Sequence, residues 1–349
     1  MTNLIITGEE EEGFSLGSGP TAIVSEDGTY EGAKGGTEMM RDKLFQMVDP
    51  DLTGTFNWIL SRVTEVKNDK PTLLWLHDMW DDPQVAHLAK EESRKRFGKL
   101  IFVSNWQQWT YAQGLQVPFQ EGIVMKNAID PIIVEKKKTD DVIRLIYHTT
   151  PHRGLDILVA SFSQLVDNLK KDGGPELHLD VYSSFEIYNW AKADDEFADL
   201  FDACREHPNI TYHGYQPNDV VREALKEAHI YGYPSTWPET SCISVLEAMS
   251  AGCAIVCPNF AALPETTANW ATMYNWNEDK HAHAQIFVNI LKSMVAAYWN
   301  EDHQLKLRHA QNYVNNFYNW DFRAMEWEGL LRGMIESLKE IQERQEAAE

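Results

Sequence analysis

Short apolar runs alternate with helical segments along most of this 349-residue chain. This alternation is typical of parallel sheets whose strands are joined by crossover helices, so it predicts an α/β fold. The expected strands are residues 4–7, 73–76, 100–103 and 123–125 in the first half, and 142–147, 177–182, 210–213, 230–233 and 254–257 in the second half.

A charged segment without periodicity, residues 135–141, separates the two sets of expected strands. A chain of this length suits two domains of roughly 150 residues each, so we place the linker at this segment. The sequence therefore predicts Rossmann-like domains at residues 1–134 and 135–319. The pattern beyond residue 277 is helical, and a last helix is expected at 320–349.

The composition supplies a core and excludes some partners. Hydrophobic residues make up 43% of the chain, with 12 Trp, 13 Tyr and 14 Phe, while the formal net charge is −22. Such a charge is repelled by nucleic acids and anionic membrane surfaces. No apolar run approaches the length of a membrane span and no leader follows Met1, so a cytoplasmic protein is expected. The sequence does not indicate an oligomeric state.

Cysteine and histidine spacing gives no sign of a metal site. The four cysteines do not form a disulfide framework, and we interpret them as small core residues in a reducing compartment. His281 and His283 are expected at a solvated helix start. No paired aspartates stand out as cation ligands, so the sequence predicts metal independence. The cysteines are Cys204, Cys242, Cys253 and Cys257.

Residues 233–252 place two glutamates around a predicted helix start. Pro238 favours an extended residue before it, and Thr240 or Ser241 suits an N-cap, so we expect a helix from about Cys242 to Gly252. The free N–H groups of its first turn suit a diphosphate.

The second of these glutamates, Glu247, lies on a mostly apolar helix. A buried carboxylate needs hydrogen-bond donors, and a ribose diol supplies two hydroxyls. In the alternative interpretation Glu239 is a solvated loop acid and Glu247 pairs with a nearby Arg or Lys.

This segment resembles the Glu, seven residues, Glu signature of the retaining glycosyltransferases of family 4, which have the GT-B fold. In that family Gly-Phe-Gly usually follows the first glutamate, whereas Thr240, Ser241 and Cys242 stand here. The resemblance implies two Rossmann-like domains facing a cleft, an acceptor-side N-terminal domain and a nucleotide-sugar-binding C-terminal domain. It also implies a last helix that packs back on the N-terminal domain.

Residues 147–156 resemble the family segment in which two cations hold the diphosphate. Arg153 stands at the lysine position, and His148 replaces the usual arginine, so one cation becomes dependent on pH. The alternative for Arg153 is a surface residue at a helix start. Gly35 and Gly36, before a helix expected near Glu38, resemble the Gly-Gly loop of the family's N-terminal domain.

His77 follows an expected strand, and its position resembles that of the family's cleft histidine. The alternative is a core histidine bonded to a backbone carbonyl. Residues 102–106 and 126–130 resemble two further turns of the family. The resemblance extends over nearly the whole chain and is densest between residues 142 and 265.

The resemblance implies a retaining transfer of a sugar from a nucleoside diphosphate sugar to a glycan or other acceptor hydroxyl, without a cofactor. Glu247 would hold the ribose, Glu239 the donor sugar, and His77 a hydroxyl near the reacting carbon; Arg153 would stabilise the leaving diphosphate. Further donor contacts are expected from Gly35, Gly36, His148, His213, Gly214, Thr240, Ser241, Cys242 and Ile243. A sugar-nucleotide epimerase, a phosphorylase and a non-catalytic carbohydrate-binding protein remain alternatives.

Overall fold

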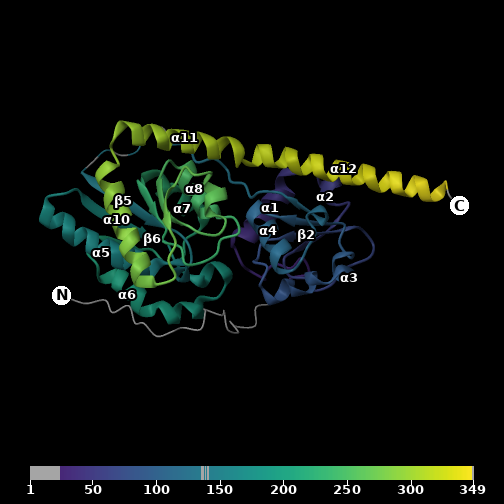
Figure 1. Ribbon diagram of the computed structural model, residues 1–349, viewed down its shortest axis with the longest axis horizontal. Coiled ribbons are helices and arrows are strands. Elements are labelled where there is room, and N and C mark those ends of the chain that lie inside the picture. Colours follow the sequence, from purple (N-terminus) through teal and green to yellow (C-terminus); the bar gives the residue numbers. More distant parts are fainter. Residues whose placement is uncertain (1–23, 135–136, 138, 140, 348–349) are drawn as a thin grey trace. The chain divides into compact units, whose positions relative to one another are not determined.

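The computed structural model describes residues 24–134, 137, 139 and 141–347. The chain divides into two compact units (Figure 1). The N-unit is Val24–Asp130 together with Asn316–Glu349, and the C-unit contains Pro131–Asn315. These divisions fall four residues before the expected boundaries at 134/135 and 319/320. One reason is that the Ile129 N–H donates to the Tyr318 carbonyl (2.7 Å). This hydrogen bond joins the segment that precedes the C-unit in the sequence to the segment that follows it.

The N-unit contains a parallel sheet of four strands in the order β1-β2-β3-β4. Its central strand β2 is buried along its whole length, which explains its continuous apolar sequence. The strands are β1 (Asn57–Leu60), β2 (Thr72–Leu76), β3 (Lys99–Phe102) and β4 (Gly122–Val124).

The helices of the N-unit begin at residues that suit helix starts. Asp49 and Asp82 each accept a backbone N–H at an N-cap, and Ser104 accepts from Gln107 N–H (3.0 Å). The helices are α1 (Gly36–Met47), α2 (Pro50–Thr53), η1 (Pro83–Ala89), α3 (Glu91–Arg94), α4 (Asn105–Gly114) and η2 (Phe119–Glu121).

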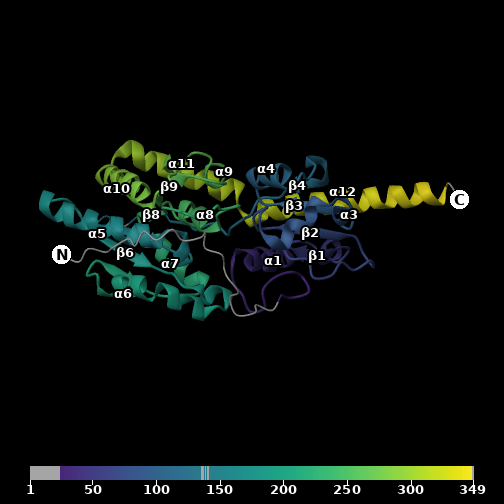
Figure 2. The same cartoon turned by 60° about the horizontal axis from the view of Figure 1, so that its bottom comes forward.

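The last helix, α12 (Trp320–Glu346), packs against α1 and α2 within the N-unit. Its Trp327 is fully buried, with ring centroids 5.5 Å from Trp58 and 4.9 Å from Trp75. These aromatic contacts attach the end of the chain to β1 and β2. The final turns of α12 run past α3 in both views (Figures 1 and 2), and their side chains are exposed.

The C-unit contains six parallel strands in the order β10-β9-β8-β5-β6-β7. The strand order reverses between β5 and β8, and in open α/β sheets ligands bind beyond the carboxyl ends of the strands at such a point. The strands are β5 (Val142–Tyr147), β6 (Glu176–Val181), β7 (Ile210–Tyr212), β8 (Ile230–Gly232), β9 (Ala254–Asn259) and β10 (Thr272–Asn275).

Helices join the strands of the C-unit, as parallel pairing requires. The longest, α5 and α10, pack against each other and against β6 and β9 respectively. The helices are η3 (Pro151–Arg153), α5 (Leu155–Asp172), η4 (Phe185–Tyr188), η5 (Ala191–Phe197), α6 (Ala198–Glu206), α7 (Asn218–Glu227), α8 (Ile243–Ser250), α9 (Leu263–Thr267), α10 (Lys280–Ala297) and α11 (Glu301–Phe317).

The α/β class and eight of the expected strands are confirmed, and β5 has the expected bounds. The expected strand at residues 4–7 lies outside the described residues. Two strands, β1 and β10, were not expected from the sequence.

The four cysteines are free and buried, as predicted. His281 is exposed, but the solvated position expected for His283 is wrong, because His283 is buried and bonds to the Tyr274 hydroxyl (2.7 Å).

Candidate functional site

The turn after β5 supplies one side of the candidate site in the C-unit. It runs through η3 to Gly154, whose φ of 101° favours glycine. A Cβ atom at Gly154 would lie 2.2 Å from the Pro234 carbonyl oxygen, so only glycine lets this turn approach the segment after β8. The Tyr147 hydroxyl donates to the Thr150 carbonyl (2.9 Å) and fixes the turn.

Two oppositely charged side chains meet where the turns after β5 and β8 come together. The Arg153 guanidinium donates to Glu239 Oε1, and the Tyr233 hydroxyl donates to the same oxygen. Glu239 is 6% exposed, so the interpretation as a solvated loop acid is wrong. Burial opposes the charge of Arg153, but the Glu239 carboxylate raises its pKa well above its usual range. Burial, and then Glu239, raise the pKa of Tyr233, which keeps its proton.

The α8 helix starts one residue after the predicted position, and its cap differs from the prediction. Cys242 is the N-cap, and no side chain accepts a hydrogen bond there, so the predicted capping by Thr240 or Ser241 is wrong. The buried Cys242 thiol lies 3.2 Å from the Ser244 hydroxyl instead. Ile243 is half-buried in the first turn, so the helix start lies at the surface of the C-unit.

Glu247 is buried on α8, with 4% of the residue exposed. Its Oε1 atom accepts from Arg222 Nη1 (2.9 Å) and from Asn218 Nδ2 (3.0 Å), both on α7. The carboxylate therefore has donors from the protein, which was the alternative in the sequence analysis. Glu247 therefore does not need ligand hydroxyls to satisfy it, contrary to the expectation from the sequence.

His148 lies directly after β5, with its ring centroid 4.9 Å from that of Tyr231. Its Nε2 atom is enclosed, and burial lowers the pKa of the ring to about 4, although a backbone hydrogen bond to Ser244 opposes this shift. His148 is therefore neutral near neutral pH in this structure. The expectation that the charge of His148 changes between mildly acidic and mildly alkaline pH is therefore wrong for this structure.

His213 and Gly214 follow β7. The His213 ring stacks on Tyr182, with centroids 4.2 Å apart and planes 3° apart, and its Nε2 atom lies 2.8 Å from Asp180 Oδ1. Burial opposes ionisation of Asp180, but hydrogen bonds from His178 and His213 lower its pKa. Gly214 has a φ of 64°, so the backbone turns sharply after the stacked ring.

The remaining predicted residues lie in the N-unit. His77 follows β2, its backbone N–H donates to the Ser61 hydroxyl (2.8 Å), and its ring lies 4.8 Å from that of Trp75. Burial, with a smaller effect of Arg62, lowers the pKa of His77 to about 3. Gly35 is the N-cap of α1, which begins at Gly36 rather than near Glu38.

Within the C-unit, the structure brings several predicted residues to the switch point between β5 and β8. Arg153 contacts Glu239 directly, and His148 connects to them through the stacked rings of Tyr231 and Tyr233. Sequence reasoning missed Tyr233, Tyr182, Asn218 and Arg222. One feature of the sequence pointed to Asn218 and Arg222. They lie four residues apart, which places them on the same face of a helix.

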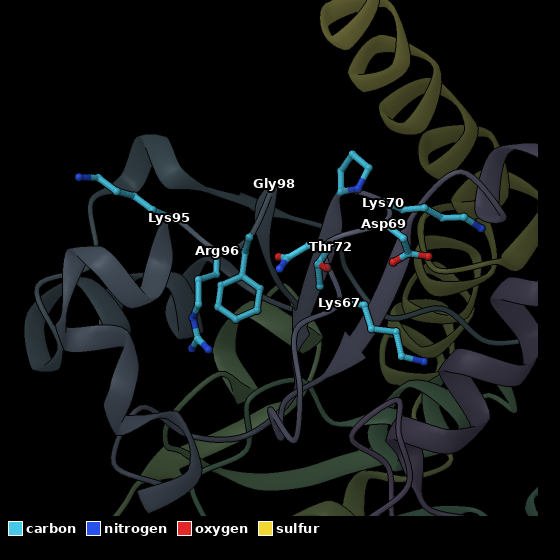
Figure 3. Close-up of a pocket in the computed structure, with 10 residues that line it drawn as sticks. Lys67, Asp69, Lys70, Thr72, Lys95, Arg96 and Gly98 are labelled. Carbon is cyan, nitrogen blue, oxygen red and sulfur yellow. The ribbon is translucent and has the colours of Figure 1, made fainter.

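One cavity of about 360 Å³ lies at the amino ends of β2 and β3, opposite the end that carries His77. Its four cations are already bonded: Lys67 pairs with Glu26, Lys95 with Glu91, Lys70 with the Gly54 carbonyl and Arg96 with the Ser93 hydroxyl. The amino groups of Lys70 and Lys95 point away from each other (Figure 3). The cations around the cavity therefore do not point together toward a position where an anion could bind.

Within the part of the chain that the structure describes, no group of three or more His, Cys, Asp or Glu side chains is placed to hold a metal ion. No helix among residues 24–134 and 141–347 is long and apolar enough to cross a membrane.

These observations define an α/β protein of two units with parallel sheets, in which charged groups meet at the switch point of the C-unit. Residues 128–291 match the model of the family Glycosyl transferases group 1. The resemblance to these glycosyltransferases is therefore confirmed for this part of the chain. No curated protein sequence is significantly similar to the chain.

Solved structures share the fold at low sequence identity. HepE of Anabaena, in complex with UDP and glucose, has a TM-score of 0.58 and 14% identity over 76% of this chain and 72% of HepE. The pneumococcal O-GlcNAc transferase GtfA, in complex with UDP and GlcNAc, has a TM-score of 0.58 and 11% identity over 76% and 53% of the two chains. A glycosyltransferase from Rickettsia africae has a TM-score of 0.58 and 12% identity over 85% and 82%. The fold is GT-B.

Proposed function

We propose that this protein is a retaining glycosyltransferase that moves a sugar from a nucleoside diphosphate sugar to an acceptor hydroxyl. The observation that carries the proposal is the position of Arg153, a half-buried permanent cation, at the switch point that also receives the start of α8. A cation and free backbone N–H groups at one place suit a diphosphate. The family match over residues 128–291 supports the same class of reaction.

In the proposed reaction, the bond between the sugar and the diphosphate breaks and negative charge develops on the leaving phosphate. Arg153 and the N–H groups of the first turn of α8 stabilise that charge. The acceptor hydroxyl attacks the anomeric carbon on the face from which the diphosphate leaves, and its proton passes to the departing phosphate. No enzymic nucleophile is assigned, and the reaction is proposed to be metal-independent.

The roles proposed for the other site residues follow from their positions in the sequence. Glu247 holds the ribose, and Glu239 binds hydroxyls of the donor sugar while it keeps Arg153 in place. His213 and Gly214, beside the stacked Tyr182, lie near the base. His77, Gly35 and Gly36 are proposed to act from the N-unit.

A binding panel tests the donor. UDP, GDP, ADP, CDP and their glucose and GlcNAc derivatives would be compared by thermal shift, beginning with UDP because the HepE and GtfA complexes hold it. A ligand at about 100 times its dissociation constant adds about 2.7 kcal/mol of stability. Arg153→Gln should abolish the shift, whereas Arg205→Gln, which removes an exposed cation, should keep it. A wild-type protein that shifts with none of these ligands would overturn the proposal.

Product analysis then separates the reactions. A transferase releases nucleoside diphosphate only when an acceptor hydroxyl or water takes the sugar, and it keeps the anomeric configuration. A phosphorylase would instead require inorganic phosphate, and an epimerase would change the sugar without releasing the diphosphate.

A second candidate is a non-catalytic carbohydrate-binding protein on the same fold. The pairing of Glu239 with Arg153, and of Glu247 with Arg222, favours it, because both carboxylates are already satisfied within the protein. Binding of a nucleoside diphosphate sugar without turnover, across acceptors of different classes, would support this candidate.

A further inference from the structure

Two aromatic rings stack at the carboxyl ends of β9 and β10 in the C-unit. Phe260 and Trp276 directly follow the last residues of these strands, and their ring centroids lie 4.5 Å apart with planes 7° apart. Trp276 is 36% exposed and Phe260 is half-buried. The pair therefore presents part of its aromatic surface to solvent.

Two exposed amides precede the stacked rings in the sequence. Asn259 and Asn275 are the last residues of β9 and β10, and they are partners in the parallel register of the two strands. Register partners of neighbouring strands lie about 5 Å apart. An amide both donates and accepts hydrogen bonds. This edge of the sheet therefore combines a flat apolar surface with polar groups of both kinds.

The stacked pair lies next to the loop that carries Glu239. The Ala262 N–H donates to the Glu239 carbonyl (3.0 Å), so the segment after β9 is bonded to the loop after β8. In the strand order β10-β9-β8-β5-β6-β7, β9 and β10 lie on one side of the switch point and β6 and β7 on the other. A donor whose base lies near His213, after β7, runs toward the switch point and ends with its sugar at Glu239. The stacked pair lies on the side beyond that sugar.

We propose that the Phe260–Trp276 pair binds a sugar ring of the acceptor, so that the acceptor is a glycan of at least two sugars. This rests on the proposed function, because the position of the pair relative to the donor depends on the roles given to Glu239 and His213. A sugar ring has C–H groups on its faces and hydroxyls around its rim. It therefore fits an aromatic surface, which offers a large apolar contact, with a few polar groups nearby.

The test begins with binding to an array of α- and β-linked di- and trisaccharides of glucose, GlcNAc, galactose, mannose and rhamnose. The wild type should bind at least one of them, and Trp276→Ala should weaken that binding at least about fivefold, because an aromatic contact is lost. Trp276→Tyr keeps a ring and should retain most of the binding. Trp299→Ala, which removes another exposed tryptophan of the C-unit, is the matched control and should bind as the wild type does.

Transfer kinetics then separate the acceptor from the donor. The oligosaccharide that binds most tightly and its terminal monosaccharide would be compared as acceptors, with the donor from the binding panel. Trp276→Ala should raise KM for the oligosaccharide at least about fivefold. It should leave kcat, KM for the monosaccharide and the affinity for the donor within about twofold of the wild type.

Other outcomes overturn the inference while the proposed function survives. Trp276→Ala that weakens the nucleoside diphosphate sugar but not the nucleoside diphosphate would place the pair at the transferred sugar. A wild type that binds no oligosaccharide, or a Trp276→Ala variant that loses melting temperature but keeps the glycan affinity, would also overturn it. Failure to bind any nucleoside diphosphate sugar would instead overturn the proposed function. If Trp276→Ala does not fold, Trp276→Leu, which keeps an apolar side chain without a ring, must weaken glycan binding.

Discussion

Arg153 and Glu239, 86 residues apart in the sequence, form an ion pair that joins the turns after β5 and β8; Glu239 is buried and Arg153 is half-buried. Tyr233 donates to the same carboxylate, and Arg153 Nε also donates to the Thr150 hydroxyl (3.1 Å). The two turns at the switch point are therefore held together before any ligand binds. Such preorganisation lowers the cost of ordering a charged site around a diphosphate.

Removal of one partner of this pair should strongly destabilise the C-unit. Arg153→Met leaves the Glu239 carboxylate buried without its cation, and breaking buried pairs in this way costs about 3–5 kcal/mol. Urea unfolding of the wild type and the variant measures the loss. The exposed pair Arg205–Asp202 provides the control, since Arg205→Met should change stability by at most about 1 kcal/mol. Equal losses in both variants would contradict the prediction.

The strands on either side of the switch point, β5 and β8, were predicted better than the contacts made there. The bounds of β5 could be predicted because Val142–Tyr147 is mostly buried and apolar. β1 was missed because it is short and begins with a polar Asn57, and β10 because only Tyr274 is buried in it. Strands this short have too few buried positions to show a pattern.

The partner of Glu247 shows a second limit of prediction from sequence, which concerns contacts between two helices. The sequence indicated a buried carboxylate and allowed a protein cation as its partner, but it could not single out Arg222. That pairing depends on how α7, which begins after β7, packs against α8, and tertiary packing is not encoded in local periodicity. The predicted cap by Thr240 or Ser241 failed for the same reason: capping propensity is local, whereas the observed N-cap, Cys242, has a buried side chain that depends on tertiary packing.

The two glycines at the ends of α5 should respond differently to a methyl group. Gly173 has a φ of 70° and open space around it, so Gly173→Ala should cost only the strain of the left-handed region, about 1–2 kcal/mol. Gly154 has a φ of 101° and faces the Pro234 carbonyl at 2.2 Å, so Gly154→Ala should cost about 3 kcal/mol or more. Denaturant midpoints would show the order, and an equal loss would contradict the close approach.

Glycosyl transfer should persist in EDTA. The diphosphate is proposed to be held by Arg153 and backbone N–H groups, which need no cation. The measurement is release of nucleoside diphosphate after dialysis against chelator, with and without added magnesium or manganese. Turnover that disappears in EDTA and returns with either ion would show that the protein groups do not suffice.

Stability should fall as the pH drops below about 6.5. Burial lowers the pKa values of His77 and His152 to about 3 and that of His148 to about 4. Between pH 6.5 and 4 the unfolded chain binds protons at these histidines and the folded chain does not, so acid favours unfolding. His152→Gln should reduce the slope of unfolding free energy against pH by up to about 1.4 kcal/mol per unit. An unchanged slope would show that His152 already carries its proton in the folded state.

The affinity for an intact nucleoside diphosphate sugar should be independent of pH between about 5.5 and 8.5, a range that brackets the ordinary histidine pKa. With a pKa of about 4, His148 is neutral throughout this range and contributes no charge to the diphosphate. His148→Gln, also neutral, should bind within about tenfold of the wild type, since a lost neutral hydrogen bond is worth about 0.5–1.5 kcal/mol at most. His148→Arg adds a permanent cation and should bind more tightly by the same factor at every pH.

The diphosphate diester of the intact donor stays ionised, so the ligand adds no titration of its own. Circular dichroism would confirm that each variant folds. Affinity that weakens with rising pH in the wild type, but not in His148→Arg, would mean that the diphosphate draws a proton onto His148, which would then act as the second cation.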